Sequence, residues 1–512
     1  MNSRLARRPR RQGASAAPLA HLEWRNLQHR FAPVDALTPD ELTLLHEASM
    51  NILEDIGMAF MDDEALDLWQ QAGAHVDRSS QMVKIDRGLL MGLLQHAPSE
   101  FVWRARNPQY NIYIGGKHLI FSPHGGTIFV SGLNVKRRPG VMEDYVEFLK
   151  IVQSCNLLHV TGEQLIVPHD IDVSFRHLQR LKAAIHYTDK PIMEATHGRV
   201  IANDNVEMMK LVFGEDITQS DQPVLGGIVN SGSPLRWDDR MCGGIIAYAR
   251  ANQVLIVTPF ILAGAVAPIT MAAAVAQQNA EALAGIALAQ LVRPGAPCIY
   301  GGFATPIDMR SGNPAFGMPE GAWATLASAQ MARHYGLPYR SSGTLNTSKV
   351  PDAQSMLETM WSTFPAMNAH ANFLQHATGW LEGGLTVNKE KIMIDIENLA
   401  MFQKYLEPVQ INADTLALEY IAKVGAGGHH FETAHTQARY STEYYSPILG
   451  DRQNHETWEK GGAQDMAARA SKVYEAVLEH YEAPALDESI SEAVSAYVDK
   501  RQRELAGVNL YY

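Results

Sequence analysis

The chain has 512 residues, of which 46% are hydrophobic and 19% are charged. This composition is typical of a water-soluble globular protein and allows one very large domain or two to four ordinary ones. A formal net charge of -12 argues against a nucleic-acid-binding protein. The cysteines Cys155, Cys242 and Cys298 are widely spaced and form no metal-binding motif. Their odd, low number suits the reducing cytoplasm, where we expect the protein to reside.

The first dozen residues are strongly basic, with arginines at positions 4, 7, 8, 10 and 11. The sequence around them is rich in Ala and Ser and lacks apolar periodicity, so we expect a disordered basic arm over residues 1–33. Binding of a phosphate group or a partner by this arm is a less favoured alternative. No apolar stretch follows the arginines, which argues against a secretory signal.

An N-terminal addition of helices and strands is predicted over residues 34–120. Thr38-Pro39-Asp40-Glu41 has the pattern of a helix start, and apolar residues recur on one face of the sequence that follows. The helical pattern extends over residues 37–106, and a short β section is predicted near 110–121.

Residues 121–410 are predicted to form a (β/α)₈ TIM barrel. A short β-branched or aromatic run repeatedly precedes a helical stretch. The predicted strands lie at 127–130, 159–162, 191–196, 224–229, 254–257, 298–303, 339–342 and 372–375. The predicted helices lie at 141–154, 171–187, 203–213, 236–250, 271–292, 319–335, 352–368 and 389–405. So many equal units favour a closed barrel over a doubly wound sheet, and apolar runs without alternation are typical of parallel strands covered by helices.

One stretch of the barrel, residues 254–276, carries no charge and reaches the length of a membrane span. Pro259, Gly264 and Pro268 interrupt it, so a buried strand, a loop and a packed helix explain it better. Residues 411–512 are predicted to be mostly helical. We expect both terminal additions to pack against the barrel as caps or oligomer contacts, in a homo-oligomer that is not attached to a membrane.

The active site of a TIM barrel lies at the C-terminal ends of its strands. This rule selects small, polar and aromatic residues, namely His124, Gly125, Gly126, Gly162, Gln164, Glu194, Thr196, His197, Asn230, Ser231, Phe260, Gly264, Gly301, Gly302, Phe303, Ser341, Ser342, Gly343, Gln375, His376, Trp380 and Glu382. The set is poor in cations and contains no carboxylate pair, lysine or metal cluster. Structural roles are the alternative for the two histidines at 197 and 376, the aromatic residues at 303 and 380, and the glycines at 301 and 302.

A zinc site at His429, His430 and His435 is disfavoured. The five-residue step from His430 to His435 places the two rings on different helix faces, and these residues follow the barrel. The sequence also lacks a P-loop, a nucleophile elbow and a dinucleotide-binding fingerprint. We therefore expect no metal bound by the chain itself.

Several specific stretches follow one another along the chain. They are Leu44-Leu45-His46-Glu47-Ala48-Ser49 with Ile56-Gly57, Asp308-Met309-Arg310-Ser311-Gly312-Asn313-Pro314-Ala315-Phe316-Gly317 with Pro319-Glu320, Ser348-Lys349-Val350-Pro351-Asp352, Gly379-Trp380-Leu381-Glu382, and His435-Thr436 running on to Glu443-Tyr444-Tyr445-Ser446-Pro447. With these stretches the chain resembles the trimethylamine methyltransferase family of corrinoid-dependent enzymes, whose branch without pyrrolysine includes glycine betaine methyltransferases. The resemblance covers about residues 31–470.

The resemblance implies transfer of a methyl group from a small methylated amine to the cobalt of a corrinoid carried by a partner protein. The family archetype carries pyrrolysine at the end of the seventh strand, whereas the matching stretch here, residues 341–346, contains only standard residues. Pyrrolysine is thought to capture neutral methylamines. Its absence therefore favours a quaternary amine such as glycine betaine, whose nitrogen is already cationic.

Aromatic faces attract quaternary ammonium groups, so Phe260, Phe303 and Trp380 are predicted to contact the substrate nitrogen. The donors His197, Asn230, Ser342 and His376 are predicted to contact a substrate carboxylate. Gly301, Gly302 and Gly343 are predicted to let the corrinoid approach the strand ends. Carnitine, proline betaine, choline or a sulfonium compound are alternative substrates, and a non-catalytic betaine-binding barrel is an alternative function. A hydrolase or aldolase is disfavoured.

Overall fold

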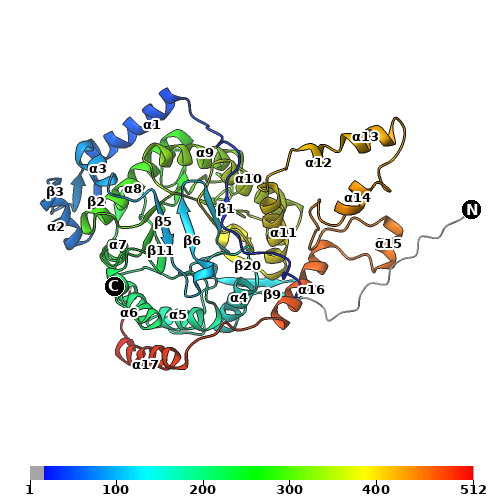
Figure 1. Cartoon of the computed structure of the whole chain (residues 1–512). Helices are drawn as coiled ribbons and strands as arrows, with labels where there is room; N and C mark the ends of the chain where they lie inside the picture. Colours follow the sequence, from blue (N-terminus) through cyan, green and yellow to red (C-terminus); the bar gives the residue numbers. More distant parts are fainter. Residues whose placement is uncertain (1–16, 511–512) are drawn as a thin grey trace, which may run out of the picture.

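The computed structural model describes residues 17–510 (Figure 1). The basic arginines and the last two tyrosines lie outside the described residues. The expectation of disorder up to residue 33 is wrong for residues 17–33, because Leu19, Leu22 and Leu27 are buried. Strand β1 (Leu27–Gln28) also pairs antiparallel with β7 (His118–Phe121).

A closed parallel barrel forms the centre of the molecule, which confirms the predicted (β/α)₈ fold. Its strands are β7, β10 (Ile192–Met193), β11 (Leu225–Val229), β13 (Val254–Val257), β15 (Cys298–Gly301), β17 (Tyr339–Ser342) and β18 (Phe373–Gln375). Residues 159–161 occupy the remaining position between β7 and β10. There the N–H of His159 donates to Phe121 O at 2.9 Å, and the N–H of Thr161 donates to Pro191 O at 3.1 Å.

The first barrel strand is β7, and the prediction of a barrel strand at 127–130 is wrong. The chain turns back after β7, and β8 (Phe129–Gly132) joins a separate four-stranded sheet in the order β19-β20-β8-β9. Its other strands are β9 (Val135–Pro139), β19 (Trp380–Leu381) and β20 (Thr386–Asn388). The pairing of β8 with β20 joins residues far apart in sequence, so the local pattern could not reveal it. Strand β7 straddles residue 120, where the N-terminal addition was predicted to end.

Helices surround the barrel as predicted (Figure 1). They are α4 (Met142–Ser154), α5 (Arg176–Tyr187), α6 (Arg199–Phe213), α7 (Asp239–Arg250), α8 (Met271–Val292), α9 (Pro319–His334), α10 (Ala353–Asn368) and α11 (Lys389–Tyr405). Side-chain caps fix several starts: Asp238 accepts from the N–H of Met241, and Asn388 accepts from that of Lys391. The uncharged stretch at 254–276 contains β13, β14 (Ile261–Ala263) and the start of α8. No helix within residues 17–510 is long and apolar enough to cross a membrane.

The N-terminal addition is a mixture of helices and strands. Its elements are α1 (Pro39–Asn51), β2 (Met58–Phe60), α2 (Asp63–Gln71), β3 (His75–Asp77), β4 (Met82–Lys84) and α3 (Arg87–Leu94). Helix α1 begins at the predicted place, where Thr38 and Glu41 form a capping box. The three helices contact α8, which explains why α8 is buried on nearly all sides. Strand β12 (Arg236–Trp237) pairs with β2 and links this addition to the loop after β11.

A hairpin closes the N-terminal end of the barrel. Strands β5 (Glu100–Trp103) and β6 (Ile112–Gly115) bring Trp103, Ile112 and Ile114 into one apolar cluster with side chains from the barrel strands. A Cβ atom on Gly226 of β11 would lie 2.2 Å from the Trp103 ring. Glycine is therefore required there for the indole to enter the barrel.

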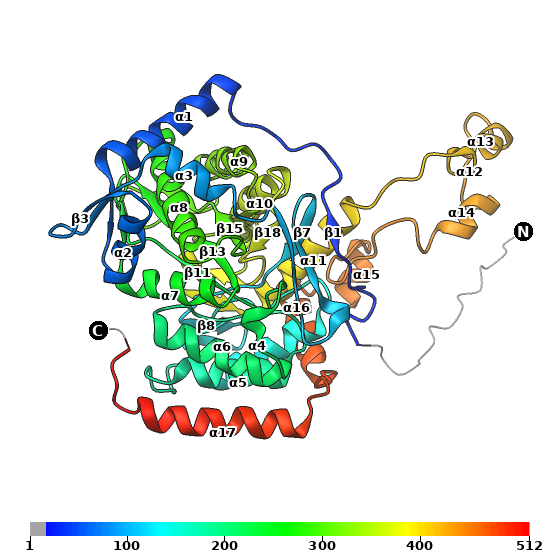
Figure 2. The same ribbon diagram turned by 60° about the vertical axis from the view of Figure 1, so that its left-hand side comes forward.

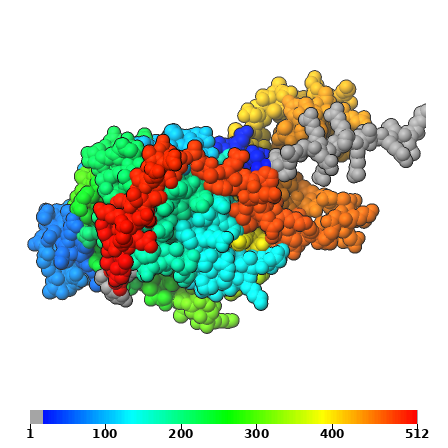
Figure 3. All heavy atoms as spheres, turned by 90° about the horizontal axis from the view of Figure 1, so that it is seen from below, coloured from blue at the N-terminus to red at the C-terminus, as the bar shows by residue number. Residues whose placement is uncertain are grey.

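The C-terminal region is helical as predicted, but its parts differ in packing. Helix α16 (Met466–Glu479) contacts α11 and α4, and α17 (Glu488–Leu505) lies along α5 and α6 (Figures 2 and 3). The segment 411–444 instead projects from the body and carries α12 (Ala413–Leu416), α13 (Leu418–Val424) and α14 (Ala434–Arg439). After it comes α15 (His455–Lys460). Large apolar side chains on segment 411–444, such as Ile411 and Phe431, are exposed. The predicted homo-oligomer stays a prediction.

Candidate active site

Five aromatic rings meet at the C-terminal end of the barrel. Phe260 and Phe303 follow β13 and β15, with ring centroids 4.6 Å apart. Phe316, which precedes α9, lies 5.8 Å from Phe303 and 5.3 Å from Trp380 of β19. Trp380 stacks on His376 at 4.6 Å and 10°. Aromatic faces arranged in this way attract a cation that has lost its water shell. We refer to Phe260, Phe303, Phe316, His376 and Trp380 as the aromatic cluster.

The polar atoms of the aromatic cluster are held by neighbouring loops and strands. The ring Nδ1 of His376 lies 3.3 Å from Ser342 Oγ at the end of β17. Trp380 Nε1 donates to Gly125 O at 3.4 Å. Burial holds the pKa of His376 well below its ordinary value, and the positive charge of Arg340 acts in the same direction. His376 is therefore a neutral ring at pH 7.

A buried arginine lies beneath the aromatic cluster, so the expectation of a mouth poor in cations is wrong. Arg340 belongs to β17 and is 1% exposed. Its Nε donates to Gln375 Oε1 at 2.9 Å, and its guanidinium carbon lies 5.1 Å from the centroid of Phe303. The preceding Tyr339 points outward, since its hydroxyl donates to Thr325 O of α9. Strand alternation therefore turns Arg340 into the barrel.

Two carboxylates also lie in this region, so the expectation of no carboxylate pair is wrong. Glu194 is fully buried and accepts from Arg180 Nε of α5 at 3.0 Å. Glu163 is 9% exposed, and its Oε1 has no partner among the described residues. Burial, together with the negative charge of Glu194, raises the pKa of Glu163 to about 8, although Arg180 and Arg340 act in the opposite direction. Each strand-end carboxylate looked isolated in the sequence, and only the fold brings them together.

His197 and Asn230 lie at the ends of other strands. His197 follows β10, and burial lowers its pKa to about 4. Asn230 follows β11, and its amide donates to Thr258 O at 2.8 Å. Among residues 17–510, neither residue forms a hydrogen bond or a ring contact with the aromatic cluster.

The predicted cofactor-contact glycines are explained by packing within the barrel. A Cβ on Gly301 would lie 1.9 Å from Thr258 Oγ1, and one on Gly302 would lie 2.5 Å from the Tyr339 hydroxyl. A Cβ on Gly343 would lie 3.1 Å from Ala377 Cα. All three missing side chains would thus point at protein atoms.

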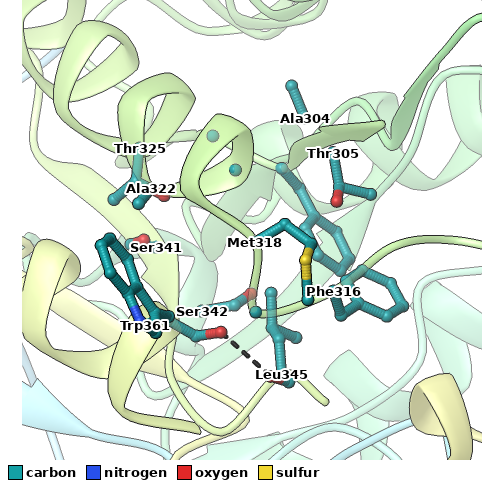
Figure 4. Close-up of a pocket in the computed structure, with 15 residues that line it drawn as sticks. Ala304, Thr305, Phe316, Met318, Ala322, Thr325, Ser341, Ser342, Leu345 and Trp361 are labelled. Atoms are coloured by element: carbon teal, nitrogen blue, oxygen red, sulfur yellow. Dashed lines mark hydrogen bonds between the residues drawn. The ribbon is translucent and has the colours of Figure 1, made fainter. Parts of the chain in front are cut away.

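A small pocket of about 30 Å³ lies beside the aromatic cluster (Figure 4). Phe303, Phe316 and Ser342 line it together with Ser341 of β17 and Trp361 of α10. This volume holds one or two water molecules and is far too small for a corrin macrocycle. No group of three or more His, Cys, Asp or Glu side chains within residues 17–510 is placed to hold a metal ion.

A model of the trimethylamine methyltransferase family matches residues 3–506. The chain belongs to this family. It is 37% identical over 469 residues to the glycine betaine methyltransferase of Desulfitobacterium hafniense strain Y51, covering 92% of this chain and 97% of the relative. It is also 28% identical to the trimethylamine methyltransferase of D. hafniense strain DCB-2, covering 91% of this chain and 93% of the relative. A trimethylamine methyltransferase of Methanosarcina mazei is 33% identical, with 93% and 97% covered. The predicted methyltransferase activity is confirmed.

In this trimethylamine methyltransferase family member, the stretch 341–346 beside the pocket is hydrogen-bonded to the segment that follows β18. Thr344 Oγ1 donates to His376 O at 2.7 Å, and Asn346 Nδ2 donates to Trp380 O at 2.5 Å. The stretch therefore holds the backbone of two members of the aromatic cluster. Phe316 was missed as a site residue because it follows no barrel strand directly, although the stretch containing it, residues 308–317, carried part of the family resemblance.

Proposed function

We propose that this methyltransferase moves a methyl group from glycine betaine, or a closely related betaine, to the Co(I) of a corrinoid carried by a partner protein. The aromatic cluster is the observation that carries this proposal. Its rings converge at the barrel end where TIM-barrel chemistry takes place, and each cation–π contact contributes roughly 0.5–2 kcal/mol. The high identity to a relative named for glycine betaine supports the same substrate.

The reaction needs little acid–base chemistry from the protein. The carbon–nitrogen bond breaks with its electron pair remaining on nitrogen, which leaves a neutral tertiary amine. The cobalt supplies the electron pair of the new cobalt–carbon bond. Because the departing amine needs no proton, neutral His376 and the protonated form of Glu163 are compatible with the reaction. The work of the chain is to position the methyl group.

The aromatic cluster binds the trimethylammonium group, and Phe316 joins the predicted Phe260, Phe303 and Trp380 in this role. Ser342 and His376 are proposed to contact the substrate at the same end of the barrel. His197 and Asn230 are proposed to line the opposite side, since β10 and β11 lie across the barrel from β18.

The corrinoid acts from outside the chain as a second substrate. The pocket beside the aromatic cluster is too small to enclose it, so a partner protein must present the cobalt at the mouth. Any contact from Gly301, Gly302 or Gly343 would be made by backbone atoms, because their Cβ positions face the protein.

The proposal is tested by mixing the purified protein with cob(I)alamin and a panel of methylated compounds, and recording the methylcobalamin spectrum. We expect turnover with glycine betaine and little or none with trimethylamine. A neutral amine would have to expel an amide-like anion, whereas a quaternary amine carries its own activation. Robust turnover of trimethylamine, or the absence of turnover with any quaternary amine, would contradict the proposal.

A further inference from the structure

Arg340 is a buried cation that forms no ion pair among the residues that the structure describes. A guanidinium has five N–H donors. Within residues 17–510, those of Arg340 donate to neutral oxygens, Gln375 Oε1 at 2.9 Å and Gly302 O at 3.5 Å. It forms no ion pair with a carboxylate of residues 17–510. By contrast, Arg180 pairs with Glu194 and Arg138 pairs with Asp144.

This arrangement is costly unless a ligand completes it, because an unpaired buried charge loses its hydration without compensation. Neutralisation of the arginine does not remove the cost. Burial lowers the pKa of Arg340 to about 9, so it remains protonated at pH 7. Glu163 interacts with it electrostatically, yet the pKa of Glu163 is itself raised to about 8 and the two form no ion pair.

The position of Arg340 relative to the aromatic cluster indicates the kind of ligand. Arg340 precedes Ser342 by two residues on β17 and therefore lies one inward position deeper in the barrel. The centroid of Phe303 lies 5.1 Å from the guanidinium carbon. Phe260, Phe303 and His376 follow the C-terminal ends of β13, β15 and β18, so these rings lie nearer the mouth than Arg340. The site thus has a cation at its base and cation-binding rings toward its opening.

The geometry points to Arg340 as the binding site for a substrate carboxylate, which makes the enzyme selective for betaines over quaternary amines that lack a carboxylate. This inference rests on the proposed function. A guanidinium can bind a carboxylate through two parallel hydrogen bonds. Gln375 holds Nε at 2.9 Å, and Nη1 makes only a long contact of 3.5 Å with Gly302 O, so the terminal nitrogens keep donors for a ligand. With its carboxylate at Arg340, a betaine places its ammonium group among the rings and a methyl group toward the mouth.

The test compares ligand binding by calorimetry in the full-length protein and in Arg340→Met, which removes the charge but keeps a long side chain. The ligands are glycine betaine, its demethylated product dimethylglycine, and choline, which has no carboxylate. We expect Arg340→Met to bind glycine betaine and dimethylglycine roughly 10- to 100-fold more weakly than the unmodified protein does, and to bind choline with an affinity within about twofold of it. The affinity of Arg340→Lys for the two carboxylated ligands should lie between those of the unmodified protein and Arg340→Met, since lysine keeps the charge but loses the forked donors of arginine.

Arg137→Met is the matched control, because Arg137 lies on β9 near the mouth but is already paired with Glu382. It should change none of the three affinities. Unchanged choline binding in Arg340→Met shows that this variant is folded. Equal weakening of glycine betaine and choline, unchanged glycine betaine binding, or no binding of either carboxylated ligand to the unmodified protein overturns the inference.

The same variants separate this inference from the proposed function. If betaine binding depends on Arg340 but cobalt is never methylated, the carboxylate site stands and the proposed function fails. If cobalt is methylated from choline as fast as from glycine betaine, with Arg340→Met unimpaired, the proposed function stands and the carboxylate site fails.

Discussion

The two ends of the barrel bury different kinds of side chain. At the N-terminal end, Trp103, Ile112 and Ile114 of the β5–β6 hairpin fill the barrel with apolar surface. At the C-terminal end, Arg340 and Glu163 are buried without an ion-pair partner in the described chain, and Arg340 lies against the ring of Phe303. The first end gains stability from the burial of apolar side chains. The second holds the buried guanidinium of Arg340, whose charge a bound carboxylate would neutralise. The contrast assigns stability to one end and recognition to the other.

The largest expected effect concerns the closed end. Trp103→Ala removes a fully buried indole from the hairpin and should lower the free energy of unfolding by about 3–5 kcal/mol, because the rigid barrel cannot collapse into the space. The measurement is urea-induced unfolding followed by circular dichroism, with Trp103→Phe as a milder control. The ratio of glycine betaine to choline affinity should not change. A changed ratio would mean that the two ends are not independent.

A smaller effect is expected from the buried carboxyl at the open end. Burial raises the pKa of Glu163 from 4.5 to about 8, so between these values the folded state keeps a proton that the unfolded state has lost. Stability therefore falls as pH rises from about 4.5 to 8, by an amount on the order of a few kcal/mol, and the decrease stops above the folded-state pKa.

Glu163→Gln removes this contribution, so its melting temperature should fall less than that of the unmodified protein between pH 5 and pH 8. Differential scanning calorimetry at several pH values measures the difference, and Glu432→Gln, at an exposed position, is the control. Parallel pH profiles for Glu163→Gln and the unmodified protein would show that Glu163 is ionised in the fold.

The smallest effect concerns one ring of the aromatic cluster. Phe303→Leu keeps an apolar side chain but removes the aromatic face. The variant should bind glycine betaine and choline more weakly by a similar factor, roughly 2- to 30-fold, because both ligands carry the same ammonium group. Binding calorimetry measures both affinities. Weaker binding of glycine betaine alone would mean that Phe303 acts on the carboxylate. The rings and Arg340 would then not have separate roles.

Much of the fold was predictable because it depends on local patterns. Helices α8 and α11 and strands β13 and β17 have the predicted bounds, since apolar periodicity and caps mark them in the sequence. The true first strand, β7, was missed because two neighbouring runs had the same local character and only distant pairing distinguishes them. The segment 411–444 was predicted as helical, but its projection from the body depends on contacts that propensity does not encode.

The candidate site was predictable where residues directly follow strands. Phe260, Phe303 and His376 were selected in this way, and the structure brings them together. Arg340 was missed because it lies inside a strand, where the side expected to face the barrel interior was not assigned. Phe316 was missed because it reaches the mouth from a loop. Both required knowledge of which side chains converge in three dimensions.

The most direct test of the central claim follows the methyl group itself. Glycine betaine labelled with ¹³C in its N-methyl groups is incubated with the protein and cob(I)alamin, and the products are measured by nuclear magnetic resonance. The account predicts equal amounts of ¹³C-methylcobalamin and dimethylglycine, with formation of both greatly reduced in Arg340→Met at limiting substrate. Dimethylglycine without labelled methylcobalamin, or neither product at saturating glycine betaine, would contradict it.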